Sequence, residues 1–323
     1  MKRVITLVLY NIIAVIIILL LLEFFVRILH PEIKSQGTDK ELIKENAYKD
    51  SPGFKPNSKG ISNGVEITID EYGLRQTKIP IDKTKVSWLL IGDSVTMGLG
   101  VESDSTFAFG LQEQNKNVNI LNSGYFGYSL KDYINVIDYY LKKKKDFQIQ
   151  KIALCWCLND IYSGEVMEYE SPGGGIRYFF NDILTWLRWN SRLYTFIKSY
   201  VSDRQKKYFE FDKQFYSPDS SLFVNAINQL AELNRKCLIN KVEFMVVLLP
   251  YEYQLRERDN YQPQELMKKY LEEKNIRVVA THTFMVGESI HSKSLFLFGD
   301  GLHFSSIGHR WISEILTAEF NYE

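Results

Sequence analysis

The hydrophobic and polar positions of this chain follow different patterns in different regions, and each pattern predicts a different element. After residue 85, short apolar runs alternate with longer mixed segments. A short continuous apolar run is typical of a strand buried on both faces of a parallel sheet, and its alternation with helices predicts a three-layer α/β/α domain. We expect strands at 86–91, 118–122, 152–157, 242–249 and 276–280, and helices at 106–114, 130–144, 222–239, 263–273 and from a Ser305 cap to Phe320.

The first segment, residues 1–30, is almost entirely apolar. Lys2 and Arg3 precede the apolar run, and Glu23 and Arg27 are the only charged residues within it. A membrane span needs about 20 apolar residues, and positive charges ahead of it favour a cytoplasmic amino terminus. A cleaved signal peptide would have a shorter apolar region ending in small residues, whereas this run ends in Glu-Phe-Phe-Val-Arg. The pattern therefore predicts an uncleaved signal anchor, with the rest of the chain outside the cytoplasm.

An insertion at about 161–221 follows the third predicted strand and breaks the alternation. It contains a Ser-Pro-Gly-Gly-Gly segment at 171–175, which favours a loop, and an aromatic-rich stretch at 177–201. Because it leaves the carboxyl end of a strand, we expect it on the side where ligands bind. A substrate-binding cap that uses Trp186 and Trp189, a packing subdomain and a contact with the membrane interface all fit this composition. The predicted organisation is an anchor at 1–30, a spacer with a short β element at 31–85 and an α/β domain at 86–323.

Composition and charge exclude some classes of protein. The 323 residues are 45% hydrophobic and 24% charged, so a large core can be buried. The 39 basic residues equal the 39 acidic ones, and no long basic run is interleaved with aromatic residues, so a nucleic-acid partner is not expected. The five histidines are scattered and none lies at zinc-site spacing from a cysteine, so we expect neither a metal nor another cofactor.

Two short motifs at opposite ends of the α/β domain carry the candidate chemistry. Ser94 follows the first predicted strand in the motif Gly92-Asp93-Ser94, and Asp300 and His303 lie three residues apart near the carboxyl terminus. A serine hydroxyl needs a general base within hydrogen-bond reach and a third group that orients this base. Ligands of open α/β sheets bind at the carboxyl ends of the strands, which is where the first motif lies. The two motifs together predict a Ser-His-Asp triad.

Two further motifs lie between them. Residues 122–127, Asn-Ser-Gly-Tyr-Phe-Gly, follow the second predicted strand, and Asn159-Asp160 follow the third. The four motifs, in this order, resemble those of the SGNH (GDSL-type) hydrolase family, whose membrane-anchored members also carry a Gly-Leu-Arg segment ahead of the first motif. The resemblance covers residues from about 86 to 320, and it implies a flavodoxin-like arrangement of the sheet.

The resemblance implies a role for five residues. The triad would consist of Ser94 as nucleophile, His303 as base and Asp300 as the residue that orients the base. The oxyanion hole would be formed by the backbone N–H groups of Ser94 and Gly127 and by the side-chain amide of Asn159. Donors of this kind typically stabilise a tetrahedral oxyanion by ~3–4 kcal/mol each. Glycine suits such a position because it lets the backbone approach a substrate closely.

The neighbours of these residues are expected to have supporting roles. Asp93 is interpreted as a residue that forms the turn and bonds the backbone, and Asp160 as one that holds the loop of Asn159. Leu158 departs from the family pattern, in which glycine is common at this position. His309 falls inside the last predicted helix with no aspartate three residues before it, so a structural role is expected.

The expected activity is hydrolysis of a carboxylic ester through an acyl-serine intermediate. The anchor and the aromatic insertion suggest that the substrate carries its acyl group on a cell-surface or exported polysaccharide. We expect this acyl group to be acetyl. One alternative is an O-acyltransferase, in which a sugar hydroxyl rather than water resolves the same intermediate. Another is a non-catalytic polysaccharide-binding or assembly factor, which would have no need of a triad and an oxyanion hole.

Overall fold

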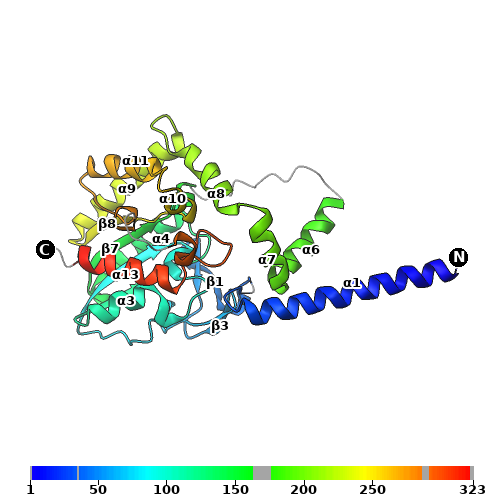
Figure 1. The fold of residues 1–323 in the computed structure, drawn as a ribbon. Helices are drawn as coiled ribbons and strands as arrows, with labels where there is room; N and C mark the ends of the chain where they lie inside the picture. Colours follow the sequence, from blue (N-terminus) through cyan, green and yellow to red (C-terminus); the bar gives the residue numbers. More distant parts are fainter. Residues whose placement is uncertain (1, 35, 163–175, 286–290, 321–323) are drawn as a thin grey trace.

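A five-stranded parallel sheet forms the centre of the α/β domain (Figure 1). The computed structural model describes residues 2–34, 36–162, 176–285 and 291–320, so the predicted loop at 171–175 lies outside the described residues. The strand order is β6-β5-β7-β8-β9, and all neighbouring pairs are parallel. These strands are β5 (Val86–Gly92), β6 (Val118–Asn122), β7 (Ile149–Trp156), β8 (Glu243–Leu248) and β9 (Arg277–Ala280). Each strand predicted from an apolar run is therefore confirmed.

Helices cover both faces of the sheet and complete the three predicted layers. On one face α3 packs against α13, and on the other α9 packs against both α4 and α11 (Figure 1). Their bounds are α3 (Phe107–Gln114), α4 (Leu130–Lys142), α9 (Ser221–Ile239), α11 (Gln262–Glu272) and α13 (Ser306–Phe320). The helix predicted at 130–144 ends at Lys142, and a separate short helix, α5 (Lys144–Phe147), follows it. Ser305 caps α13 as predicted, because its Oγ accepts the Gly308 N–H at 3.3 Å.

The sheet is buried because its strands are apolar in sequence. In β7 only Gln150 is exposed, and in β5 only Val86 is not fully buried. Trp88 of β5 meets Phe320 of α13 edge to face, with ring centroids 5.5 Å apart. Burying one large apolar side chain contributes about 1.5–3 kcal/mol. The packed layers therefore hold the carboxyl ends of the strands in fixed positions.

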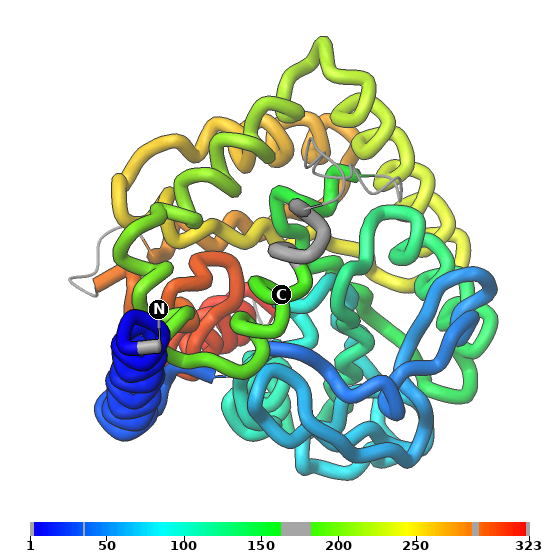
Figure 2. Tube along the Cα trace, turned by 90° about the vertical axis from the view of Figure 1, so that its right-hand side faces the viewer, coloured from blue at the N-terminus to red at the C-terminus, as the bar shows by residue number. Residues whose placement is uncertain are grey.

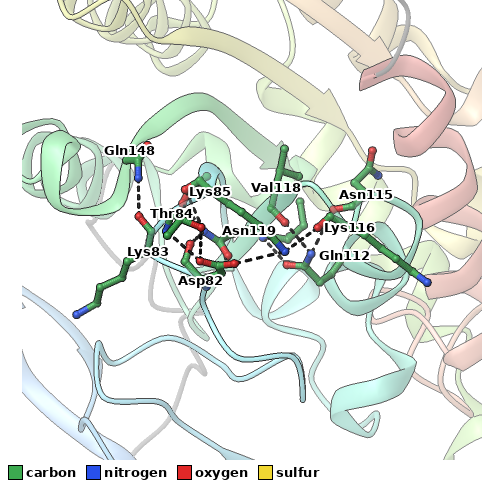
Figure 3. A network of polar contacts seen from close by, with 12 residues as sticks. Asp82, Lys83, Thr84, Lys85, Gln112, Asn115, Lys116, Val118, Asn119 and Gln148 are labelled. Carbon is green, nitrogen blue, oxygen red and sulfur yellow. Dashed lines mark hydrogen bonds and ion pairs between the residues drawn. The ribbon is translucent and has the colours of Figure 1, made fainter.

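A polar network fixes the opposite, amino-terminal ends of β5 and β6 (Figure 3). Asn119 exchanges two hydrogen bonds with the backbone of Asp82, at 2.9 and 2.8 Å. Gln112 of α3 donates to the Val118 carbonyl at 2.8 Å and accepts the Ile120 N–H at 2.7 Å. These contacts satisfy backbone groups near the starts of the two strands and help to fix β5 and β6 relative to each other. They lie at the edge of the sheet opposite the candidate site.

Residues 31–85, expected to be a spacer with a short β element, contain two β-hairpins. The hairpins consist of β1 (Ile43–Tyr48) with β2 (Ser51–Phe54), and β3 (Lys59–Ser62) with β4 (Val65–Thr68). The first hairpin packs on α4, where the Ser51 hydroxyl donates to Asp132 at 2.6 Å and the Asn135 amide donates to Asp50 at 2.7 Å. Polar residues in this region therefore make specific contacts with the α/β domain.

Among the described residues, the first helix, α1 (Lys2–Leu29), is the only one that is long and apolar enough to cross a membrane. Its most apolar part has a mean hydropathy of 3.0, and none of this part is buried. Its 28 residues extend about 42 Å at about 1.5 Å per residue. The hydrocarbon core of a bilayer is about 30 Å thick. If α1 spans a membrane from near Val4, the hydrocarbon would end near Glu23, and the last helical turns would lie outside it.

The end of α1 contacts the insertion at the junction of α6 (Ile176–Asn190) and α7 (Arg192–Val201) (Figure 1, Figure 2). The Glu23 carboxylate accepts hydrogen bonds from the Ser191 hydroxyl at 2.7 Å and from the backbone N–H groups of Arg192 and Leu193, each at 3.0 Å. It therefore satisfies the free N–H groups at the start of α7, where a negative charge also favours the helix dipole. Arg27 donates to the carbonyl at the end of α6, at 2.8 Å.

Candidate active site

The strand order places the candidate residues in a crevice at the carboxyl edge of the sheet. The chain leaves β5 toward β6 on one side, and it leaves β7 toward β8 on the other. Neighbouring strands whose connections run in opposite directions leave a crevice between them, and ligands of open α/β sheets bind there. Ser94 follows β5 and Asn159 follows β7. The two residues therefore flank the switch point.

Ser94, His303 and Asp300 form a continuous hydrogen-bonded chain. The Ser94 Oγ lies 2.8 Å from His303 Nε2, and His303 Nδ1 lies 2.9 Å from Asp300 Oδ1. A carboxylate only accepts hydrogen bonds, so Nδ1 carries the imidazole proton and Nε2 is left to accept the serine proton. The Asp300 oxygen also accepts the backbone N–H groups of Leu302 and His303, each at 2.9 Å. The structure thus brings together the two motifs that the sequence separates by 209 residues.

The charges of the triad support this assignment. Burial disfavours the charged forms of both partners, but the adjacent Asp300 raises the pKa of His303 above its ordinary value. The same pair keeps the pKa of Asp300 far below its usual range, against the effect of burial. Asp300 is therefore ionised at any physiological pH, and its charge favours the protonated form of His303.

A sharp turn presents the Ser94 hydroxyl. Asp93 caps the short helix α2 (Ser94–Met97) by accepting the Val95 N–H at 2.8 Å, which is the backbone-bonding role predicted for it. A Cβ on Gly92 would lie 2.0 Å from the Thr96 hydroxyl, and one on Gly124 would lie 2.4 Å from the backbone of α2. Only glycine fits at positions 92 and 124, which belong to the first and second motifs. Both motifs are therefore needed for the chain to turn this tightly.

Arg75 supports the far end of α2, and the sequence assigned it no role. Its side chain is 2% exposed, and its guanidinium donates to the carbonyls of Met97, Gly98 and Val101. Burial lowers the pKa of Arg75 to about 10, so the group remains charged at neutral pH. The Gly-Leu-Arg segment at 73–75 therefore holds the helix that begins with Ser94.

Two backbone N–H groups are free to receive an oxyanion. Within the described part of the chain, neither the Ser94 N–H nor the Gly127 N–H makes a hydrogen bond. Gly127 has a φ of +74°, and a Cβ built on it would meet nothing within 4 Å. Its backbone is therefore open to a bound molecule, as the predicted role requires.

Asn159 is held in place by its neighbours. Its backbone N–H donates to the Tyr251 hydroxyl at 3.1 Å, and its side-chain Nδ2 lies 3.5 Å from an oxygen of Asp93. Asp160 accepts the Cys157 N–H at 2.7 Å, so it holds the turn of Asn159 as predicted. Leu158 has no positive φ, so this turn does not need the glycine that the family commonly has there.

A tyrosine and aspartate network behind Asn159 was not anticipated from the sequence. The Tyr251 hydroxyl donates to one oxygen of Asp212 at 2.6 Å, and the Tyr162 hydroxyl donates to the other at 2.5 Å. Asp212 ends α8 (Arg204–Asp212), so it belongs to the insertion. Tyr251 follows β8 at the same sheet edge as Asn159, and this position is the signal that could have identified it. The insertion therefore supports the candidate oxyanion hole through its last helix.

Other candidate residues lie elsewhere. His309 is buried in α13 and accepts the Phe107 N–H at 3.2 Å, which agrees with the structural role expected of it. Burial lowers its pKa to about 3. Trp186 and Trp189 lie on α6 with 61% and 52% of their surface exposed. The described residues include no group of three or more histidine, cysteine or acidic side chains that could hold a metal ion.

Comparison with known proteins finds structural similarity at low identity. No protein-family model and no curated protein matches the chain. It is similar to the acetylxylan esterase Axe2 from Geobacillus stearothermophilus, with 14% identity over 75% of this chain and 98% of that chain, and a TM-score of 0.46. A member of the lipolytic protein G-D-S-L family from Veillonella parvula DSM 2008 has 16% identity over 74% of this chain and 100% of its own, with a TM-score of 0.42. A lipase/acylhydrolase from Enterococcus faecalis has 14% identity over 73% and 95%, with a TM-score of 0.44. At these values the function has to be inferred from the site itself.

Proposed function

We propose that this protein is a membrane-anchored serine esterase of the SGNH type. The observation that carries the proposal is the unbroken chain of hydrogen bonds from the Ser94 hydroxyl through His303 to the ionised Asp300. His303 takes the serine proton as Ser94 attacks the ester carbonyl, and it returns this proton to the leaving alcohol. A water molecule, activated by the same histidine, then releases the acid from the acyl-serine.

The free N–H groups of Ser94 and Gly127 support an acyl-transfer reaction. The tetrahedral intermediate carries a negative charge on the former carbonyl oxygen, and donors that are already oriented stabilise it without reorganisation. We infer that the Asn159 amide adds a neutral donor to this set. A binding protein would gain nothing from this set, so the site favours an enzyme over a non-catalytic assembly factor.

The contacts of α1 support an anchor that is retained. Glu23 and Arg27 together make four hydrogen bonds to the α6–α7 junction. Cleavage after α1 would leave the first N–H groups of α7 without this carboxylate and would expose Leu193, which packs on Val26. A helix that is part of the fold in this way is a poor candidate for removal. We infer a cytoplasmic amino terminus and an extracytoplasmic α/β domain.

For the substrate, we propose an acetyl ester on a cell-surface or exported polysaccharide. A tethered enzyme acts on material that lies near the membrane surface. The exposed rings of Trp186 and Trp189 supply flat apolar faces of the kind that stack on sugar rings. Transfer of the same acyl group to a sugar hydroxyl, instead of to water, remains the alternative outcome of the same chemistry.

Labelling with a fluorophosphonate tests the nucleophile directly. The full-length protein in neutral detergent should be labelled at one site, and Ser94→Ala should remove both the label and the hydrolysis of a short-chain ester. Loss of a triad member typically lowers the rate by ~10⁴–10⁶-fold. A Ser94→Ala variant with native circular dichroism that kept more than a few per cent of the activity would exclude Ser94 as nucleophile.

Membrane retention tests the anchor. The protein should stay in the membrane fraction after an alkaline carbonate wash, and a reporter active only outside the cytoplasm should work when fused after Glu323. A mature chain that begins after Arg27 would contradict the anchor while leaving the esterase proposal intact.

A further inference from the structure

A cationic pocket lies beside the catalytic triad. It is lined by residues that follow α1, by residues of α6, α7 and α8, and by the loop that carries Asp300. Its volume is about 50 Å³, compared with the ~10–15 Å³ that one water molecule needs. A small ionic group therefore fits. The charged residues that line it are Glu32, Lys34, Arg188, Lys198, Arg204 and Asp300.

The two carboxylates of the pocket already have partners. Glu32 is hydrogen-bonded to His30 Nδ1 at 2.8 Å, and Asp300 is bonded to His303. In the described ranges, none of the four lysine and arginine side chains lies within ion-pair distance of a carboxylate. The Nε atom of Arg188 is closed to solvent and has no hydrogen-bond partner among the described residues. The pocket therefore presents positive charge that the carboxylates of the described residues do not neutralise.

Lys198 shows the effect of this arrangement. Burial, followed by the neighbouring charges of Arg188 and Arg204, lowers its pKa to about 8. Like charges that are held together in a partly buried place destabilise the folded protein, and a bound anion relieves the repulsion. The site is therefore arranged to favour a negatively charged occupant.

We propose that Arg188, Lys198 and Arg204 form a binding site for a phosphate ester group next to the triad. The fork of an arginine side chain matches a pair of phosphate oxygens, and a lysine adds a point charge. A phosphate, with up to two negative charges, also neutralises more of this cluster than a single carboxylate does. This binding site is separate from the proposed esterase activity, because it would bind phosphate whether or not Ser94 is catalytically active.

The phosphate ester group could come from either of two sources. The pocket includes residues 32–34, which follow the end of α1, so the head group of an anionic phospholipid lies close when α1 spans a membrane. A phosphate carried by the substrate is the other source, because Asp300 lines the pocket and also holds the catalytic base. The same three side chains would bind the phosphate in both cases.

Thermal unfolding of the full-length protein in neutral detergent tests the site, with inorganic phosphate as the probe. Phosphate should raise the Tm of the wild type and of Lys206→Gln, which removes a cation on α8 outside the pocket. For Lys198→Gln and Arg188→Gln the apparent Kd should weaken at least about tenfold, because each loses a charge-assisted hydrogen bond. Without phosphate, the Tm of Lys198→Gln should equal or exceed that of the wild type, since the repulsion is relieved, so a loss of binding is distinguished from a failure to fold.

Nanodiscs of phosphatidylcholine, with and without phosphatidylglycerol, separate the two sources. If a lipid head group fills the site, phosphatidylglycerol should raise the Tm of the wild type but not of Lys198→Gln, and inorganic phosphate should add nothing further. If the substrate supplies the group, inorganic phosphate should give the same shift in both bilayers. Equal binding by the wild type, Lys198→Gln and Arg188→Gln, or no shift of the wild type with either probe, overturns the proposal.

Discussion

The hydroxyl of Tyr251 offers a test of how the candidate oxyanion hole is held. It accepts the Asn159 N–H at 3.1 Å and donates to Asp212 at 2.6 Å, and Tyr251 is 1% exposed. Tyr251→Phe removes one oxygen atom without changing the ring that packs there. The Asn159 turn then loses its anchor, and the amide is free to move away from the position of the oxyanion.

The structure sets limits on the size of the effect. Removing Asn159 itself, as Asn159→Ala, should lower kcat by ~10²–10³-fold with little change in KM, because the amide acts mainly on the transition state. This loss is the ceiling for Tyr251→Phe, which leaves the amide present but less well oriented. We expect kcat to fall ~10–100-fold, equivalent to about 1.4–2.7 kcal/mol of barrier. The lost hydrogen bonds to Asp212 and to the Asn159 N–H should together lower the free energy of unfolding by about 2–4.5 kcal/mol, which a typical domain tolerates.

Tyr162→Phe is a matched control. It removes the other hydrogen bond to Asp212, at 2.5 Å, and among the described residues the Tyr162 hydroxyl makes no hydrogen bond to Asn159. Tyr251→Phe should lose more thermal stability than Tyr162→Phe, because its hydroxyl makes two hydrogen bonds and that of Tyr162 makes one to Asp212. Only Tyr251→Phe should lose kcat on a short-chain ester. In the Asn159→Ala background, Tyr251→Phe should have little further effect, because the two changes act on the same donor. Equal losses of kcat in the two tyrosine variants, or full additivity with Asn159→Ala, would refute the role of Tyr251.

The remaining predictions concern pH and substrate. His303 must be neutral to accept the serine proton, so activity should fall as the pH drops through its pKa in the folded protein. Because Asp300 raises that pKa against the effect of burial, the acid limb of kcat/KM should lie above the ordinary histidine value of about 6.5; a limb below this value in the wild type would contradict the geometry of the pair. Replacing Trp186 and Trp189 by alanine should impair action on an acetylated polysaccharide much more than on a small soluble ester. If the activity on both substrates fell equally, the insertion would have only a structural role. A preference of the enzyme for long acyl chains would exclude the polysaccharide as the substrate.

The sequence alone determined the central strands of the α/β domain and identified the members of the candidate triad. Buried parallel strands are apolar throughout, so the strands could be located from short runs such as 118–122. Motif residues that directly follow a strand had to meet at one edge of the sheet, and this placed Ser94 and Asn159. The spacing of Asp300 and His303 fits both into one turn. These features depend on residues that are near one another in the chain, which is why a pattern could reveal them.

Tertiary structure decided the contacts between residues that are distant in the sequence. Tyr251 is 92 residues from Asn159 and 39 from Asp212, and no local pattern marks such a set. In the sequence, Glu23 is only a charged residue within an apolar run. In the folded chain, it bonds the start of α7, which is 168 to 170 residues away. The cationic pocket likewise joins segments that follow α1, lie in the insertion and carry Asp300. Hydrogen bonds and electrostatic forces act through space, so the groups that support the nucleophile and its base became visible only when the chain was folded.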